Sequence, residues 1–131
     1  MIVVDASVLA GAIGDDGHDG RRARRELRAA GELAAPDLVD VETTAVLRKR
    51  WLSGGLSDER FAAAIQDLED LLLERYPTSQ LVRRAYELRA NVSPYDAAYV
   101  ALAEALDCEL VTADLKLSKA TGPRCPIRLL T

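Results

Sequence analysis

Residues 93–114 read SPYDAAYVALAEALDCELVTAD, and this stretch decides the fold. Ser93 followed by Pro94 is typical of a helix start, because the serine hydroxyl can cap a free N–H group and proline has no N–H to leave unpaired. The residues that follow are apolar nearly all round, which predicts a buried helix. Residues 110–112 (LVT) then predict a short strand that ends near Asp114. A buried helix that leads into a strand is typical of an α/β protein.

The alternation of strands and helices continues outward from this stretch in both directions. Strands are expected at residues 2–4, 33–35, 75–76, 110–112 and 127–130. Further helices are expected through residues 8–9, in the arginine-rich segment up to Ala30, over 37–52 and over 78–90. A turn-rich stretch is expected from Gly14 to Gly20. The helix after Ser57 is expected to carry on one face Phe61, Ile65, Leu68 and Leu72. Strands separated by helices predict a parallel sheet with helices on both faces. The predicted fold is therefore a three-layer α/β/α arrangement, with residues 1–131 forming a single domain.

The composition places the chain among ordinary globular proteins. Hydrophobic residues make up 49% and charged residues 29% of the 131 residues, which argues against a disordered tail. The two cysteines, Cys108 and Cys125, match no zinc or thioredoxin spacing. No run of residues has the length of a membrane span or the pattern of a secretory signal. We therefore expect a cytoplasmic protein with free thiols and no membrane attachment.

The net charge of −4 argues at first against a polyanionic partner. The distribution of charge matters more than its sum, however, and arginines gather at residues 21–28, with a second basic group at 48–50. The first group could grip RNA phosphates or could be a solvated helix face, and the sequence favours neither. The charge therefore neither establishes nor excludes RNA as a partner.

Four acidic residues are expected to meet at one edge of the sheet. Asp5 and Asp114 lie just past the ends of two predicted strands, and Asp96 lies at the start of the helix that leads into the second strand. Ligands of open α/β sheets bind beyond the carboxyl ends of the strands. Glu42 is the fourth candidate, because it lies on a partly apolar helix face, where an uncompensated carboxylate is costly to desolvate. We expect Glu42 to point toward the same edge.

Carboxylates crowded in this way repel one another and take up protons unless a cation neutralises them. Oxygen ligands favour a hard divalent ion, which points to Mg²⁺ or Mn²⁺. Such ions can bind a phosphate, activate a water molecule and stabilise a leaving oxygen, so no serine, cysteine or histidine nucleophile is required. The pattern favours phosphodiester hydrolysis, with these candidate catalytic and metal-binding residues: Asp5, Glu42, Asp96 and Asp114.

Each of these acids also has a simpler explanation. Asp5 could cap the short helix after it, Asp96 could complete a capping box, and Asp114 could be a turn residue. Glu42 could be a solvated helix residue. Taken one at a time, the simpler explanations are favoured, because isolated polar residues are unspecific signals. The order of the four acids along the chain and their local sequence context have to decide between these explanations and a shared site.

Order and context resemble those of the PIN-domain toxins of bacterial toxin–antitoxin pairs, the VapC-like ribonucleases. The resemblance rests on four stretches in the family's order: residues 3–7 (VVDAS), 36–48 around Glu42, 93–103 (SPYDAAYVALA) and 110–114 (LVTAD). The first stretch alone is weak, because an aspartate after apolar residues is common. The third and fourth at this separation are far more specific, and the four together extend over nearly the whole chain.

The resemblance implies a metal site formed by Asp5, Glu42, Asp96 and Asp114. Ser7 and Thr112 are similar to hydroxyl residues that support the site in such proteins. The resemblance further implies endonuclease activity on RNA with Mg²⁺ or Mn²⁺, a protein antitoxin that blocks the site, and a homodimer.

Two positions depart from the family's common pattern. Ala45 stands where relatives often carry asparagine, and Lys116 stands where many have a polar or acidic group. These departures bear on a second tightly held metal more than on the first, and they keep open a non-catalytic PIN-like module that binds RNA or a protein. A third hypothesis, a phosphoryl-transfer or phospho-receiver domain with Asp5 as nucleophile, ranks last, because Ser7 stands where a haloacid-dehalogenase-like pattern needs a second aspartate.

Overall fold

The computed structural model describes residues 1–130, and its strands join into one sheet. The strands are β1 (Ile2–Val4), β2 (Leu33–Pro36), β3 (Glu74–Tyr76), β4 (Glu109–Thr112) and β5 (Ile127–Leu129). They lie in the order β3-β2-β1-β4-β5, and each neighbouring pair is parallel. The predicted α/β fold with a central parallel sheet is confirmed.

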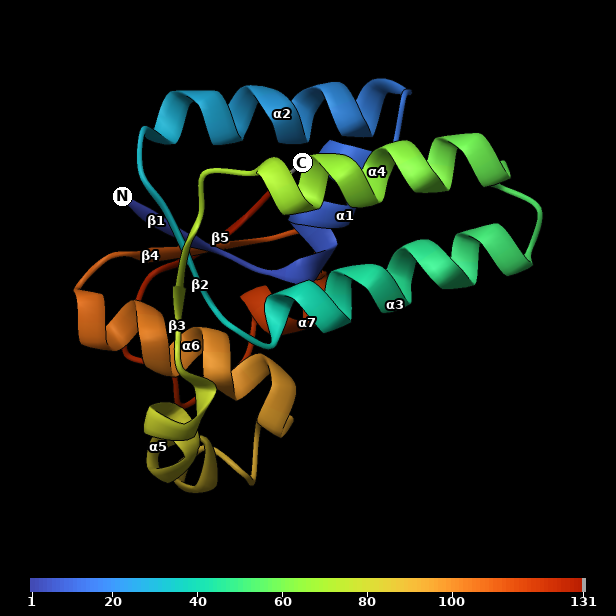
Figure 1. The fold of residues 1–131 in the computed structure, drawn as a ribbon. Helices are drawn as coiled ribbons and strands as arrows, with labels where there is room; N and C mark the ends of the chain where they lie inside the picture. Colours follow the sequence, from blue (N-terminus) through green and yellow to red (C-terminus); the bar gives the residue numbers. More distant parts are fainter. Residues whose placement is uncertain (131) are drawn as a thin grey trace.

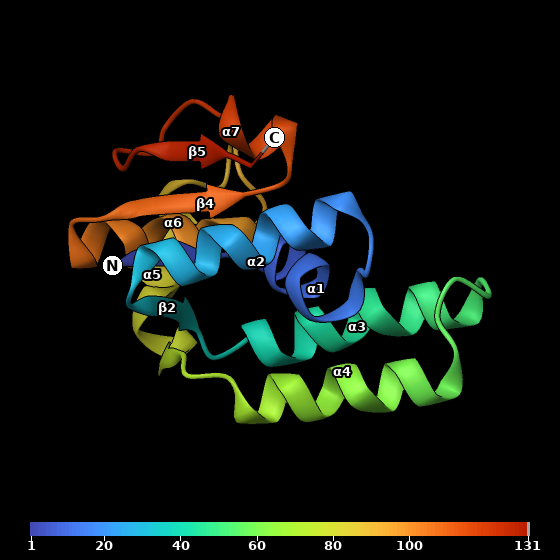
Figure 2. The ribbon, with the colours of Figure 1, turned by 90° about the horizontal axis from the view of Figure 1, so that it is seen from above.

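Helices cover both faces of this sheet. The longer helices are α1 (Ala6–Gly14), α2 (His18–Ala30), α3 (Val39–Leu52), α4 (Asp58–Asp70) and α6 (Pro94–Leu106). The short ones are the 3-10 helix η1 (Thr78–Leu81), α5 (Val82–Glu87) and α7 (Leu115–Ser118). Helices α5 and α6 lie on one side of the sheet and α1 and α2 on the other, where α3 and α4 run side by side as a hairpin (Figure 1 and Figure 2). Among residues 1–130, no helix is long and apolar enough to cross a bilayer.

The core of the protein is built on β1, β4 and α6. Val3, Val4, Leu110 and Val111 are fully buried, as expected of central parallel strands that are covered on both faces. Helix α6 contacts β1, β2 and β4, and all its side chains over residues 97–103 are buried, which confirms the expectation from its apolar sequence. This packing fixes the start of α6 relative to the ends of the two strands.

The strand order places the carboxyl ends of β1 and β4 beside each other. From β1 the chain continues to β2 and β3 on one side, whereas β4 and β5 lie on the other side. The crevice beyond the strand ends at such a reversal is where open α/β sheets bind their ligands. Asp5 directly follows β1, and Asp114 lies just past the end of β4, so both belong to this edge.

The structure corrects the sequence prediction at three helices. Helix α2 already begins at His18, so the expected turn-rich stretch is confined to residues 15–17. The single helix expected over 78–90 is instead η1 followed by the short α5. Leu72, expected on the apolar face of α4, lies beyond the end of α4 and is 91% exposed.

The end of the chain contains a helix that the sequence did not predict and one residue outside the described range. Helix α7 was not predicted, because its four residues are too short for a helical period to be recognised. The prediction of a single domain over residues 1–131 includes Thr131, which lies outside the described residues, and it stays a prediction.

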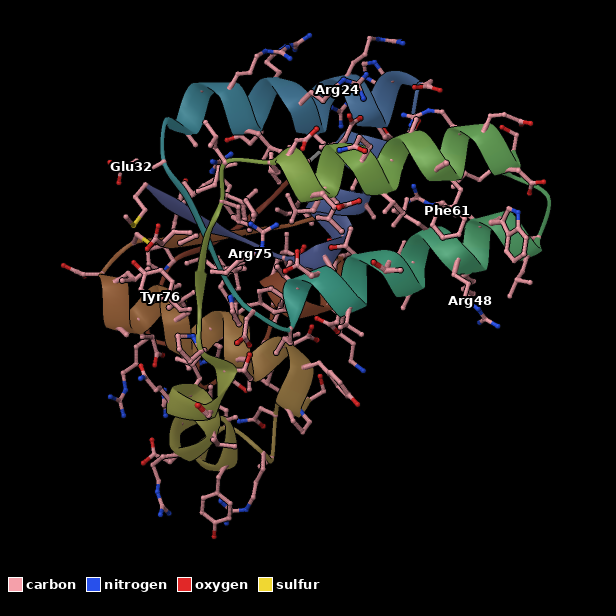
Figure 3. All side chains as sticks on the ribbon, viewed as in Figure 1. Arg24, Glu32, Arg48, Phe61, Arg75 and Tyr76 are labelled. Atoms are coloured by element: carbon pink, nitrogen blue, oxygen red, sulfur yellow. The ribbon has the colours of Figure 1, made fainter. Side chains whose placement is uncertain are left out.

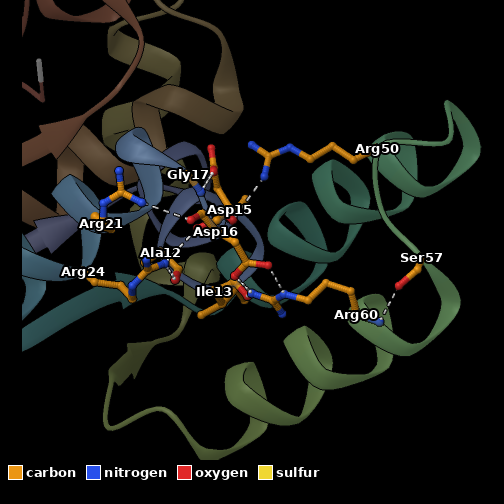
Figure 4. Close-up of polar contacts among 11 residues, drawn as sticks. Ala12, Ile13, Asp15, Asp16, Gly17, Arg21, Arg24, Arg50, Ser57 and Arg60 are labelled. Atoms are coloured by element: carbon orange, nitrogen blue, oxygen red, sulfur yellow. Dashed lines mark hydrogen bonds and ion pairs between the residues drawn. The ribbon is translucent and has the colours of Figure 1, made fainter.

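Arginines from three helices hold the C-terminal half of α1 (Figure 4). Arg24 of α2, Arg50 of α3 and Arg60 of α4 each donate a hydrogen bond to a carbonyl oxygen of α1, at 3.0, 3.3 and 2.8 Å. Cations suit this end of a helix because its dipole is negative there. Arg60 also pairs with Asp16 at 3.0 Å. Arg24, a member of the arginine-rich segment, therefore has a structural role.

The α3–α4 hairpin is fixed at both of its ends. At its tip, the rings of Trp51 and Phe61 lie 6.1 Å apart, centroid to centroid. At its base, Arg75 of β3 forms two hydrogen bonds with the carboxylate of Asp40, at 2.8 and 3.0 Å. Figure 3 shows Phe61 between the two helices and Arg48 pointing into solvent from α3. Arg48 is therefore free to serve as a surface charge.

Gly20 approaches the α1–α2 turn more closely than a side chain allows. A Cβ atom at this position would lie 1.7 Å from the carbonyl oxygen of Asp15. Gly20→Ala should therefore lower the free energy of unfolding by roughly 1–3 kcal/mol, measured by urea denaturation.

The matched control for this change is Gly11→Ala. A Cβ atom on Gly11 would meet Ala23 Cβ at 3.8 Å, an ordinary contact. Because alanine is the better helix former, Gly11→Ala should leave the free energy of unfolding unchanged or raise it by up to about 1 kcal/mol. Equal stability of the two variants would contradict this account of the turn.

Candidate active site

The carboxylate of Asp5 is buried at the strand ends. Asp5 caps α1 and is only 5% exposed. Its Oδ1 accepts hydrogen bonds from the Ser7 hydroxyl at 2.5 Å and from the Val8 N–H at 3.2 Å, and its Oδ2 accepts from the Thr112 hydroxyl. Burial raises the pKa of Asp5, and the three hydrogen bonds oppose that rise. The structure therefore holds this carboxylate in one orientation.

Two hydroxyls connect Asp5 to the loop that carries Asp114. The Ser7 hydroxyl accepts a hydrogen bond from the Ala113 N–H at 3.0 Å, and the Thr112 hydroxyl accepts from the Asp114 N–H at 3.0 Å. The structure thus places Ser7 and Thr112 where hydroxyls that support the site would lie. Asp114 itself is exposed and caps α7, accepting from the Lys116 N–H at 2.9 Å.

Asp96 lies in the first turn of α6, within electrostatic range of both other aspartates. The Ser93 hydroxyl accepts a hydrogen bond from the Asp96 N–H at 3.2 Å, as the predicted helix start requires. Partial burial raises the pKa of the Asp96 carboxyl, and the negative charges of Asp5 and Asp114 raise it further. Lys116 offsets part of this effect.

Glu42 points toward the same edge from the first turn of α3, as expected. The Tyr99 hydroxyl donates a hydrogen bond to Glu42 Oε1 at 2.6 Å. Desolvation raises the pKa of Glu42, the hydrogen bond from Tyr99 lowers it, and the charges of Asp96 and Asp5 raise it again. Glu42 therefore lies within electrostatic range of Asp5 and Asp96, and Asp114 joins the group through Asp96.

Tyr99 is the residue that sequence reasoning missed. It is 1% exposed and lies one turn after Asp96 in α6, so its ring is part of the core. The only available signal was its hydroxyl, since a tyrosine in an otherwise apolar buried helix needs a polar partner. That partner is Glu42.

Each of the four acids lies at the start of a helix. Asp5 and Asp114 cap α1 and α7, and Glu42 and Asp96 lie in the first turns of α3 and α6. The positive end of the helix dipole favours a negative charge at each position. Each acid can therefore both stabilise the start of a helix and belong to a shared site.

The donor set fits a hard divalent cation. Its oxygens come from carboxylates, which Mg²⁺ and Mn²⁺ prefer, and no ion pair within residues 1–130 neutralises any of the four. In the same part of the chain, no three His, Cys, Asp or Glu side chains are already gathered tightly enough to form a closed ligand set.

Comparison with known proteins finds relatives along the whole chain. A family model described as PIN domain matches residues 2–123. The ribonuclease VapC9 of Mycobacterium tuberculosis is 45% identical over 130 residues, which cover 99% of this chain and 98% of the relative.

Two solved structures share the fold. VapC20 of Mycobacterium tuberculosis, described as a sarcin-ricin loop cleaving toxin, superposes with a TM-score of 0.68 at 20% identity, over 90% of this chain and 93% of that chain. VapBC2 of Rickettsia felis, solved bound to a DNA fragment from its promoter, superposes with a TM-score of 0.68 at 19% identity, over 100% of both chains.

Tyr99→Phe removes the hydroxyl that holds Glu42 and leaves the buried ring in place. We expect this variant to stay folded and to bind Mn²⁺ roughly 10- to 100-fold more weakly, as measured by calorimetric titration, because Glu42 loses the group that orients it. Tyr95→Phe in the same helix is the matched control, since Tyr95 is 62% exposed. Equal Mn²⁺ affinity of the two variants would show that Tyr99 only fills space.

Proposed function

This chain belongs to the PIN-domain family, and on that premise we propose that it is a metal-dependent endoribonuclease, the toxin of a toxin–antitoxin pair. The near full-length match to a VapC ribonuclease supports hydrolysis of RNA phosphodiester bonds. The observation that carries the proposal is that four carboxylates lie beyond the strand ends and influence one another's charge, while no ion pair within residues 1–130 involves any of them.

We assign the metal site to Asp5, Glu42, Asp96 and Asp114, with Mg²⁺ or Mn²⁺ as the ion. When bound, such an ion supplies charge for the phosphate and lowers the pKa of an attacking water. The chain's own residues orient the carboxylates that would hold this ion. Ser7 and Thr112 fix the Asp5 carboxylate, and Tyr99 keeps Glu42 turned toward the strand ends.

The partners belong to the same proposal. RNA is the substrate, and a cognate antitoxin protein covers the carboxylate edge. The VapC identity of the 45% relative and the fold shared with VapBC2 support the antitoxin. The homodimer and the cytoplasmic location stay predictions from the sequence.

The proposal predicts cleavage that requires both metal and Asp96. Purified, partner-free protein should cut a mixed pool of structured RNAs with Mg²⁺ or Mn²⁺ and should be inactive in EDTA. Asp96→Asn should lower the rate by more than about 100-fold, because one oxygen ligand loses its charge. Cleavage is measured on denaturing gels.

Asp107→Asn provides the control for this experiment. Asp107 ends the same helix, is exposed, and has a left-handed backbone (φ 53°), which asparagine also tolerates. The control should cut at the wild-type rate. If folded wild-type protein binds RNA and Mn²⁺ without cutting any RNA, the non-catalytic binding module left open by Ala45 and Lys116 becomes the better account.

A further inference from the structure

A separate cleft of about 250 Å³ opens beside the carboxylates, between α1 and α2. Its lining includes Val8 and Gly11 from α1 and Ala23 from α2. A Cβ atom on Gly11 would lie 3.8 Å from Ala23 Cβ, so small residues let the two helices approach each other here. The part of the lining between the two helices, which we call the floor of the cleft, is therefore apolar.

The rim of this cleft carries charges of both signs that do not pair. Asp15, Asp19, Arg22 and Arg50 all line it, yet none takes part in an ion pair within residues 1–130. The rim therefore offers both hydrogen-bond donors and hydrogen-bond acceptors to a ligand.

Local contacts hold these side chains in place. Arg50 is half-buried and donates to an α1 carbonyl at 3.3 Å, reaching toward the turn that carries Asp15 (Figure 4). Arg22 is also half-buried, and its Nη2 lies 2.7 Å from His18 Nε2. A guanidinium has five N–H donors, so each arginine keeps several donors for a ligand. Asp15 accepts from the Gly17 N–H through one oxygen, which leaves the other oxygen available.

We propose that this cleft is a base-recognition subsite that takes one nucleobase of the RNA, and that guanine fits it best. A phosphate would meet two carboxylates together with the two guanidiniums and would gain little. A nucleobase is neutral, has apolar faces for the floor and presents both donors and acceptors at its edges. Guanine offers O6 and N7 to an arginine, and its amino group can donate to a carboxylate.

The position of the cleft determines which base it reads. Ser7 and Ala113 line the cleft, and they are also the residues that join Asp5 to the loop of Asp114. A base seated in the cleft therefore belongs to a nucleotide beside the scissile phosphate. This inference rests on the proposed RNA substrate, and it adds the residues that set sequence preference.

The test measures binding in EDTA, so that it does not depend on cleavage. Fluorescence anisotropy gives the affinity for uridine octamers that carry one central guanosine, one central adenosine or neither. Wild-type protein should bind the guanosine octamer about tenfold more tightly than the others. Arg22→Ala should reduce this preference to within about twofold. Arg25→Ala is the matched control, because Arg25 lies on the same helix, is exposed and does not line the cleft.

The other outcomes separate the hypotheses. Equal affinity of wild-type protein for all three octamers, or an unchanged preference in Arg22→Ala, overturns the base subsite. In Arg22→Ala, an equal loss of affinity for all three octamers, with a salt dependence reduced by about one phosphate contact, means that Arg22 binds the RNA backbone instead. That result also overturns the proposal. Failure to bind any octamer, both in EDTA and, for the Asp96→Asn variant, with Mn²⁺, contradicts the RNA substrate itself, which is the proposed function.

Discussion

The buried carboxylate of Asp5 is the constraint on which the rest of the structure depends. A buried charge is costly unless hydrogen bonds and an opposite charge surround it. Helix α1 supplies the Ser7 hydroxyl and the Val8 N–H, and β4 supplies the Thr112 hydroxyl. These bonds can form only if β1 and β4 are neighbours and α1 begins directly after β1. Among residues 1–130 no ion pair supplies the opposite charge, and the negative charges of Glu42, Asp96 and Asp114 increase the need for it.

Helix α1 connects the buried Asp5 with the surface of the protein. Its first turn orients Asp5, and its C-terminal half is held by arginines from α2, α3 and α4. The helix is therefore fixed at both ends, and Val8 and Gly11 in its middle line the cleft. Arg50 links the two functions, since it binds a carbonyl of α1 and lines the cleft as well. Metal binding and base recognition are thus proposed along one rigid helix.

The sequence predicted those parts of the structure whose cause is local. Short β-branched runs indicated β1 and β4, which placed Asp5 and Asp114 at neighbouring strand ends, and the apolar surroundings of Glu42 indicated that it points inward. Tyr99 was missed because its partner lies 57 residues away and a buried tyrosine resembles ordinary core. The role of Arg50 was equally invisible, because the carbonyl that it contacts is 40 residues distant. Local patterns thus predict elements and strand ends, whereas long-range side-chain contacts need the fold.

The most direct test of a cation-dependent carboxylate site is the urea unfolding of wild-type protein and Asp96→Asn, each in EDTA and with Mn²⁺. Removing one of several repelling, partly buried charges should make the variant more stable than wild type in EDTA, on the order of 1 kcal/mol. Mn²⁺ at 100 times its dissociation constant should stabilise wild type by about 2.7 kcal/mol and the variant much less. A wild-type protein that does not respond to Mn²⁺, together with a variant that is less stable in EDTA, would contradict the account.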